Sequence, residues 1–120
     1  MDINQAIKQR RTIQTFSKTR VSEYVIEKSI VAANQAPCHR MTFPWRFTSI
    51  GRKKRELLYQ LQMSIKFVNT SFNESQCQKI KDKIFNPSHL LVASQVCAPN
   101  SVQKLEDYAA CSCAIQNLSL

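Results

Sequence analysis

Two adjacent arginines and a threonine, Arg10, Arg11 and Thr12, form the first group of side chains whose chemistry suggests a ligand. A guanidinium group presents paired N–H donors in a plane that matches a phosphate group, and the threonine hydroxyl can add a further donor. Adjacent arginines point in different directions, so one can bind an anion while its neighbour packs or pairs. The alternative interpretation is an ordinary solvated basic turn.

A proline-framed loop over residues 35–47 carries the second group, which includes Gln35, His39 and Arg40. Loops held on a rigid scaffold commonly carry function. A cation or polar donor in this loop can stabilise negative charge that develops on a bound ring. The alternative for His39 is a surface loop histidine, and we expect Trp45 to pack in the core.

A third basic group, Arg52-Lys53-Lys54-Arg55, stands at the start of a predicted helix, where cations oppose the helix dipole. Such a run can bind phosphate without specificity, but we interpret it as a solvated face. Glycine occurs once, at Gly51, and this excludes a dinucleotide fingerprint or a P-loop, since both need several glycines. Side chains must therefore hold the phosphate of any nucleotide that binds.

The charge balance is strongly basic, with 17 Lys and Arg against 8 Asp and Glu, and a net charge of +9. This excess attracts anions, which include phosphates, nucleotides, nucleic acids and acidic lipid surfaces.

The longest apolar runs have four residues, whereas a membrane span needs about 20. No signal peptide is visible at the N-terminus, so we expect a cytoplasmic protein.

The five cysteines are irregularly spaced, and without a secretion signal this argues against a disulfide framework. The chain has no C-x-x-C motif, and His39 and His89 stand far apart, so we expect no metal site. We interpret the cysteines as buried or idle thiols.

Hydrophobic periodicity and capping residues predict five helices and two strands. The predicted helices span residues 2–9, 23–34, 53–68, 75–85 and 103–120, and the predicted strands span 45–50 and 89–96. Asp2 and Ser22 are the expected N-caps of the first two helices. The length of 120 residues predicts a single domain over residues 1–120. The hydrophobic content of 43% argues against wholesale disorder.

Three of the helices carry apolar stripes that we expect to be buried. The stripes are Ile26, Ile30 and Ala33; Leu57, Leu61, Ile65 and Val68; and Tyr108, Cys111, Ile115 and Leu118, widened by Leu105, Ala109 and Ala110. The last helix runs to Leu120 without the glycine, proline or polar tail that helix ends usually carry. Two strands alone also make a poor sheet. Both observations favour missing downstream sequence over a genuine terminus at Leu120.

Three blocks of the sequence together resemble the nitroreductase family. They read AIKQRRTI over residues 6–13, APCHRMTFPWRF over residues 36–47, and EDYAA with AIQNL over residues 106–118. The second block most resembles the branch whose loop reads A-P-N-H-x-x-T-E-P-W-R-F. The blocks occur in the family's order, and the resemblance spans essentially the whole chain.

The resemblance implies an α+β fold with helices around a mostly antiparallel sheet, which would be incomplete here at its C-terminal end. It implies an FMN-dependent oxidoreductase that passes electrons from NADH or NADPH to nitroaromatics, quinones or similar small-molecule acceptors. Members of the family form intertwined homodimers with two FMN molecules at the subunit interface. The flavin carries the chemistry, so no dedicated catalytic residue is expected.

By matching position, Arg10, Arg11 and Thr12 would hold the phosphate and ribityl chain of FMN. Gln35 and His39 would lie near the flavin.

The chain departs from the family pattern at four positions of these blocks and the residue before the second. Thr12 stands where serine is commoner and keeps the hydroxyl, and Gln35 stands where this branch often has a basic residue. Cys38 replaces a usual asparagine or aspartate, and Phe43 replaces a usual glutamate or glutamine. The family also continues into a glycine-rich segment, further strands and a late basic residue, which this sequence does not contain. We therefore expect the activity to be impaired in this chain.

Two other interpretations stay open, namely a catalytically inactive remnant of such an enzyme and a basic nucleic-acid-binding protein. The basic residues are scattered and no nucleic-acid-reading motif is recognisable, which argues against the second. We therefore expect neither nucleic acid nor a membrane as a partner.

Overall fold

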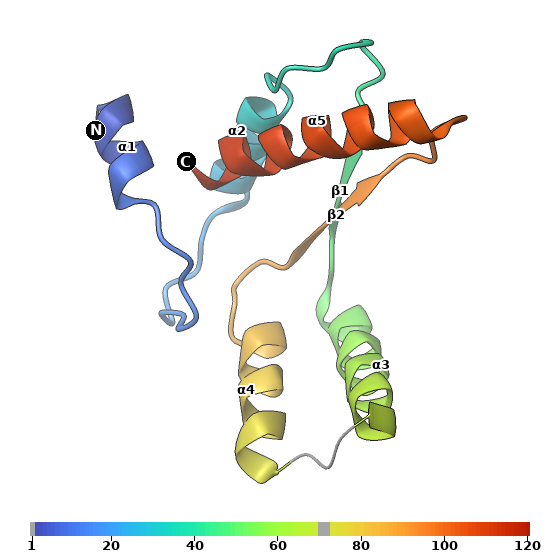
Figure 1. Ribbon diagram of the computed structural model, residues 1–120. Helices are drawn as coiled ribbons and strands as arrows, with labels where there is room; N and C mark the ends of the chain where they lie inside the picture. The colour runs from blue at the N-terminus through green and yellow to red at the C-terminus, as the bar shows by residue number, and fades with distance from the viewer. Residues whose placement is uncertain (1, 70–72) are drawn as a thin grey trace. The chain divides into compact units, whose positions relative to one another are not determined.

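The computed structural model describes residues 2–69 and 73–120, and these hold five helices and two strands in the predicted order (Figure 1). The helices are α1 (Ile3–Gln9), α2 (Glu23–Ala33), α3 (Arg52–Asn69), α4 (Glu74–Phe85) and α5 (Ser101–Ser119), and the strands are β1 (Trp45–Ser49) and β2 (Leu91–Gln95). Each predicted boundary lies within two residues of the observed one. The α+β class is confirmed.

The two strands pair in antiparallel register. The backbone N–H of Ile50 donates to Leu90 O at 2.8 Å, and that of Val96 donates to Pro44 O at 2.8 Å, one bond at each end of the ladder. The second strand is shorter than the predicted range 89–96 because it pairs only along the five residues of β1.

Chain contacts divide the molecule into two compact units. The first comprises the residues up to Thr12, Val21–Thr48 and Val92–Leu120, and the second comprises Ile13–Arg20 and Ser49–Leu91. The single domain that we expected over residues 1–120 stays a prediction.

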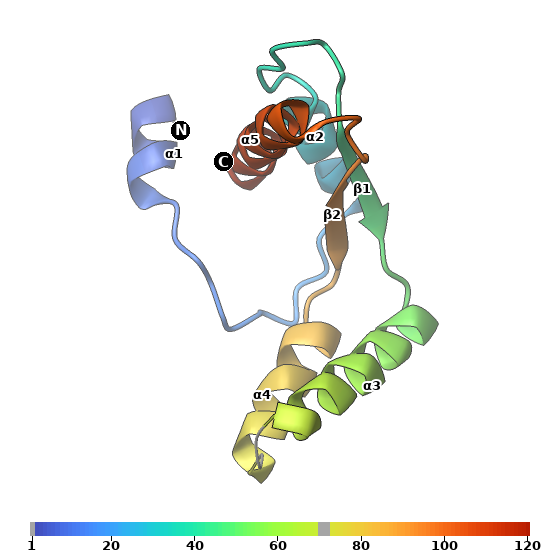
Figure 2. The same cartoon turned by 45° about the vertical axis from the view of Figure 1, so that its right-hand side comes forward.

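The core of the first unit forms where α2 packs on α5, as both Figure 1 and Figure 2 show. Its buried members are Ala33, Ala36, Trp45, Ala110, Cys111 and Ala114, with Cys38, Phe47 and Leu118 packed at its margin. Most of these side chains are small. Alanine and cysteine therefore let the two helices approach closely around one large indole ring.

The predicted stripe of α5 is partly wrong. Ala110 and Cys111 are buried as expected, but Leu105 is 71% exposed, Tyr108 is 66% exposed and Ile115 is exposed as well. Close packing selects the face that carries the small residues, so the large apolar side chains of α5 point elsewhere.

In the second unit, α3 and α4 lie side by side, and Ile80 and Ile84 of α4 are buried. The ring of Tyr59 meets that of Phe85 at 5.9 Å between centroids. The predicted burial of the α3 stripe is wrong, since each of its members is more than half exposed: Leu57, Leu61, Ile65 and Val68. The reason is that α4 contacts a different face of α3, the one that carries Tyr59.

The helix starts test the predicted N-caps. Asp2 accepts a hydrogen bond from Asn4 N at 3.1 Å, so this cap is confirmed. Ser22 occupies the N-cap position of α2, but its side chain makes no capping hydrogen bond.

None of the helices in the described part of the chain is long and apolar enough to cross a bilayer.

Candidate functional site

The loop between α2 and β1, which contains the predicted site residue His39, is tied to α5 by two polar contacts. Arg40 Nε lies 2.6 Å from Glu106 Oε2, and the Thr42 hydroxyl donates to Asp107 Oδ1 at 2.6 Å. The two carboxylates are neighbours in α5. The loop is therefore fixed to one end of the helix that also forms the core.

Asp107 is the more consequential of the two carboxylates because only 4% of its surface is exposed. Its second partner is the side-chain amide of Gln103, one turn earlier in α5, at 3.5 Å. A buried carboxylate needs donors to replace the water that it loses. Thr42 supplies the short one, so the loop and the helix depend on each other.

The ion pair of Arg40 and Glu106 is solvent-exposed, with half of the Arg40 side chain accessible. The hydrogen bond to Glu106 raises the pKa of Arg40, and the same bond lowers the pKa of Glu106. Exposed pairs of this kind contribute little to folding stability. Its main effect is to hold the Arg40 side chain against α5.

The loop backbone is strained at two places. Met41 and Phe43 have φ angles of 51° and 43°, in the left-handed region that residues with a Cβ seldom adopt. Strain of this kind persists only where surrounding contacts fix the conformation, and it concentrates at functional sites. Here the Thr42 contact lies between the two strained residues, and the Phe43 ring packs edge-on against Trp45 at 5.9 Å.

Trp45 closes the loop at the start of β1. The indole is buried, and its Nε1–H donates to Asn34 Oδ1 at 2.9 Å. This confirms the prediction that Trp45 packs in the core. It also joins the end of α2 to the start of β1, which sets the two ends of the loop.

Cys38 lies at the base of the loop, half-buried against the core. Its sulfur is 3.3 Å from Phe43 N and 3.4 Å from Thr42 Oγ1. Burial raises the pKa of the Cys38 thiol, but the hydrogen bonds from Thr42 and Phe43 outweigh this effect and leave the pKa below its ordinary value. The Thr42 hydroxyl lies within hydrogen-bond distance of both the Cys38 sulfur and the Asp107 carboxylate, and the N–H of Phe43 is a second donor to the sulfur.

A shallow hollow of about 530 Å³ opens between the loop and α5. It is lined by Pro37, Cys38, His39, Glu106, Ala109, Ala110 and Cys113. The exposed His39 thus borders a depression on the first unit, as a ligand-facing histidine would. Gln35 is exposed two residues before Pro37 and does not line this hollow.

The three residues of the predicted phosphate site follow the end of α1 and are exposed. One guanidinium nitrogen of Arg11 donates to Lys8 O at 2.7 Å and to Arg10 O at 2.8 Å, so this side chain binds the carbonyls at the helix end. Within residues 2–69 and 73–120, no hydrogen bond or salt bridge is found that joins Arg10, Arg11 or Thr12 to Gln35 or His39.

The third basic group divides into two kinds of residue. Arg52, Lys53 and Lys54 are exposed, but Arg55 is 6% exposed, so the predicted solvated face is wrong for Arg55. Its guanidinium donates to the carbonyls of Ile50, Ile84, Pro87 and Ser88 at 2.7–3.2 Å. Burial, together with the charge of Arg52, lowers the pKa of Arg55. Arg55 is therefore a structural brace of the second unit.

The cysteines are free, but they do not share one environment. Cys111 is buried, whereas Cys97 and Cys113 are exposed. Burial is therefore confirmed for Cys111, and the idleness of the two exposed thiols stays a prediction. Burial raises the pKa of Cys111, and the nearby Asp107 adds to this effect.

Our sequence analysis missed Thr42 and Asp107, which fix the loop. A signal was present, because Glu106 and Asp107 are the only acidic residues of the last helix. A carboxylate beside the apolar residues of a helix that packs in the core indicates a buried polar contact.

Comparison with known proteins identifies the class to which this fold and loop belong. The nitroreductase family matches residues 7–120, and the chain is a member of that family. Among curated relatives, YfhC of Bacillus subtilis (strain 168), whose name assigns it to the NAD(P)H nitroreductases, is 33% identical over 117 residues. That alignment covers 95% of this chain and 60% of YfhC. The chain thus spans about three-fifths of the length of this relative.

Solved structures agree with this assignment. A nitroreductase-like family protein from Bacillus cereus superposes with a TM-score of 0.77 at 25% identity, covering 99% of this chain and 63% of that one. A nitroreductase with bound FMN from Bacteroides fragilis NCTC 9343 superposes with a TM-score of 0.68 at 15% identity, covering 98% of this chain and 62% of that one. The second likeness shows the shared fold.

Proposed function

We propose that this chain belongs to a cytoplasmic FMN-dependent oxidoreductase that passes electrons from NADH or NADPH to nitroaromatics, quinones or similar acceptors. The observation that carries the proposal is the family match over residues 7–120, because this range includes every residue that we assign to the flavin. The name of YfhC and the FMN bound to the Bacteroides fragilis protein support the same donor and cofactor.

The phosphate of FMN would bind at Arg10, Arg11 and Thr12. The segment over residues 8–20 contains five cations and no carboxylate, so nothing within it competes for a guanidinium. Nη1 of Arg11 already donates to two carbonyls at the end of α1, but its Nε and Nη2 atoms are further donors, and Arg10 and Thr12 are exposed as well. This donor set fits a doubly charged phosphate.

The ring of the flavin would lie near Gln35 and His39. An amide or imidazole N–H can donate to ring atoms that gain negative charge, and a fixed donor does so without reorganising. Bound FMN would supply hydride acceptance and electron transfer. The strained loop of Met41 and Phe43, braced on α5, supports a role in which His39 is held in place.

We also propose that the complete protein is a homodimer. On α5, the apolar side chains of Leu105, Tyr108 and Ile115 are exposed. Large apolar side chains on the outside of a helix are typical of protein–protein interfaces. A second subunit would remove them from water.

Anaerobic reduction tests this function. The chain is mixed with FMN, freed of unbound flavin on a desalting column, and then treated with NADH or NADPH while the absorbance of the bound flavin is followed. We expect the yellow absorbance to bleach, and to return when a quinone or a nitroaromatic is added. A chain that retains flavin but never bleaches with either donor would contradict the proposal and favour an inactive remnant.

A further inference from the structure

The α3–α4 pair contains a hollow of about 270 Å³ that is separate from the loop described above. It is lined by Gln62 and Lys66 of α3 and by Gln76, Lys79, Ile80 and Lys83 of α4. The α4 residues recur at spacings of three, one and three, and the α3 residues are four apart. Each set therefore forms one face of its helix.

The residues that line the hollow are mostly basic or neutral. Three of the six residues are lysines, and none is acidic. The nearby carboxylate of Asp82 accepts from Gln78 at 2.8 Å, and that of Glu56 accepts from Gln60 at 3.3 Å, each along its own helix. Residues 52–85 hold eight cations against three carboxylates. The hollow thus concentrates positive potential.

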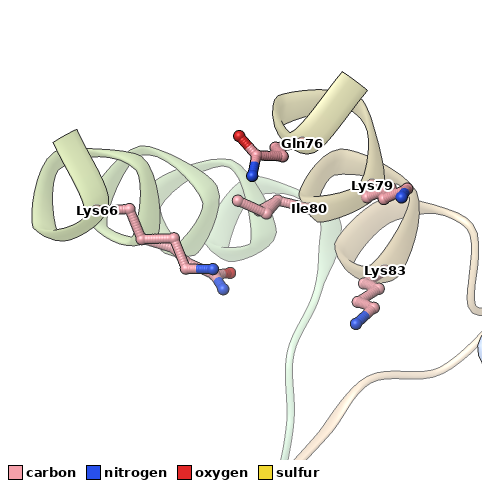
Figure 3. A pocket seen from close by; sticks show the side chains of 6 residues that line it. Lys66, Gln76, Lys79, Ile80 and Lys83 are labelled. Carbon is pink, nitrogen blue, oxygen red and sulfur yellow. The ribbon is translucent and has the colours of Figure 1, made fainter. Parts of the chain in front are cut away.

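Figure 3 shows how the two helices contribute to the hollow. Lys66 extends from α3 toward α4, while Gln76 and Ile80 project from α4 toward α3. Ile80 is buried and forms an apolar floor. The Oε1 atom of Gln76 accepts from Asn73 N at 3.0 Å in the capping box, which leaves its amide nitrogen as a donor.

Like charges four residues apart, such as Lys79 and Lys83, destabilise an isolated helix. An anion seated between them would reverse that effect. Concave walls of low dielectric focus the field of their charges, which strengthens such a contact relative to an open surface. The hollow is also smaller than the roughly 300–1,000 Å³ of pockets that bury a whole small molecule. It therefore suits an anionic group better than a complete cofactor.

We infer that this hollow is a binding site for the phosphate group of a small molecule, with Lys66, Lys79 and Lys83 as its cations. The inference does not depend on the flavin proposal, since the hollow lies entirely within the second unit. A chain that binds no flavin would still bind phosphate here, and a flavoprotein could lack this second site.

Titration with inorganic phosphate at constant ionic strength tests the inference, with backbone amide chemical shifts as the readout. We expect saturable shifts on the facing sides of α3 and α4. The double variant K79Q/K83Q should weaken binding by about tenfold, since it removes two exposed cations that line the hollow. The matched variant K53Q/K54Q removes two exposed charges of α3 outside the hollow and should leave the affinity unchanged.

Circular dichroism of each variant checks that the helices remain folded, and the single variants K79Q and K83Q replace the double variant if it unfolds. Shifts that never saturate, or an equal loss of affinity in K53Q/K54Q, would show diffuse charge attraction and overturn the inference.

A second pair of titrations identifies the source of the phosphate. NADPH carries a 2′-phosphate that NADH lacks, so tighter binding of NADPH with shifts at the hollow would support a dinucleotide phosphate. Equal binding of the two dinucleotides, with saturable binding of inorganic phosphate, would support a free phosphate or another monoester. Binding of neither NADPH nor inorganic phosphate at the hollow would exclude the site.

Discussion

The contact between Thr42 and Asp107 joins the candidate flavin loop to the core helix through one hydroxyl proton. The pair was not predictable from sequence spacing, because the two residues stand 65 positions apart. Only the packing of α2 on α5 brings them together. The proline frame made His39 a candidate site residue, and this stays a prediction, whereas the contact that holds its loop could not be predicted.

Replacing Thr42 with valine keeps the shape of the side chain and removes the donor. We expect T42V to lower the free energy of unfolding by about 1–3 kcal/mol, because the buried Asp107 carboxylate loses its short hydrogen bond. Urea unfolding measures this change. The control T48V alters an exposed threonine of β1 and should change stability by no more than about 0.5 kcal/mol. Equal stability of the two variants would contradict the proposed brace.

The lowered pKa of Cys38 predicts a pH dependence of its reactivity. The thiolate is the reactive form, so a depressed pKa keeps Cys38 reactive at lower pH. In a variant with alanine at Cys77, Cys97, Cys111 and Cys113, alkylation by iodoacetamide should rise with pH at a lower midpoint in the folded chain than in urea. A higher midpoint in the folded chain would show that burial outweighs the hydrogen bonds to the sulfur.

At the scale of elements, periodicity predicted the helices but not which of their faces would be covered. The stripe that includes Leu57 and Leu61 shares one side of α3, as its spacing requires, yet α4 packs elsewhere. On α5, the small Ala110 and Ala114 face α2 while Leu105 is exposed. A hydrophobic period says which residues lie together, whereas burial depends on the partner that approaches.

Arg55 shows the same limit of sequence patterns. It belongs to a basic run, yet it holds the end of α4 and the segment before β2. Replacing it with methionine retains an apolar stem but removes donors to Ile84 O and Pro87 O. We expect R55M to destabilise the chain by roughly 2–4 kcal/mol, since hydrogen bonds to charged groups are the stronger kind. Thermal and urea unfolding measure this, and R52M at an exposed neighbour is the control. A stability loss no larger than that of R52M would contradict the buried role of Arg55.

At the scale of the whole molecule, the sequence predicted the family and the fold, but it did not predict how the site residues come together. Sequence blocks were sufficient to identify the nitroreductase family, and the superposed structures confirm its fold. The site residues could be nominated only by matching position. Arg10 and His39 lie on separate segments, and no side-chain pattern along the chain encodes how a shared ligand would bring them together.

We propose above all that the residues at the end of α1 bind the phosphate of FMN. Affinities for FMN and for riboflavin, which lacks the phosphate, test it most directly when measured by flavin fluorescence quenching on the same protein. We predict that FMN binds at least about tenfold more tightly, as one or two charge-assisted contacts would provide. In R10A this preference should fall toward unity, while R20A, a matched change in the same basic segment, should retain it. An R10A variant that keeps the full preference for FMN over riboflavin would contradict the account.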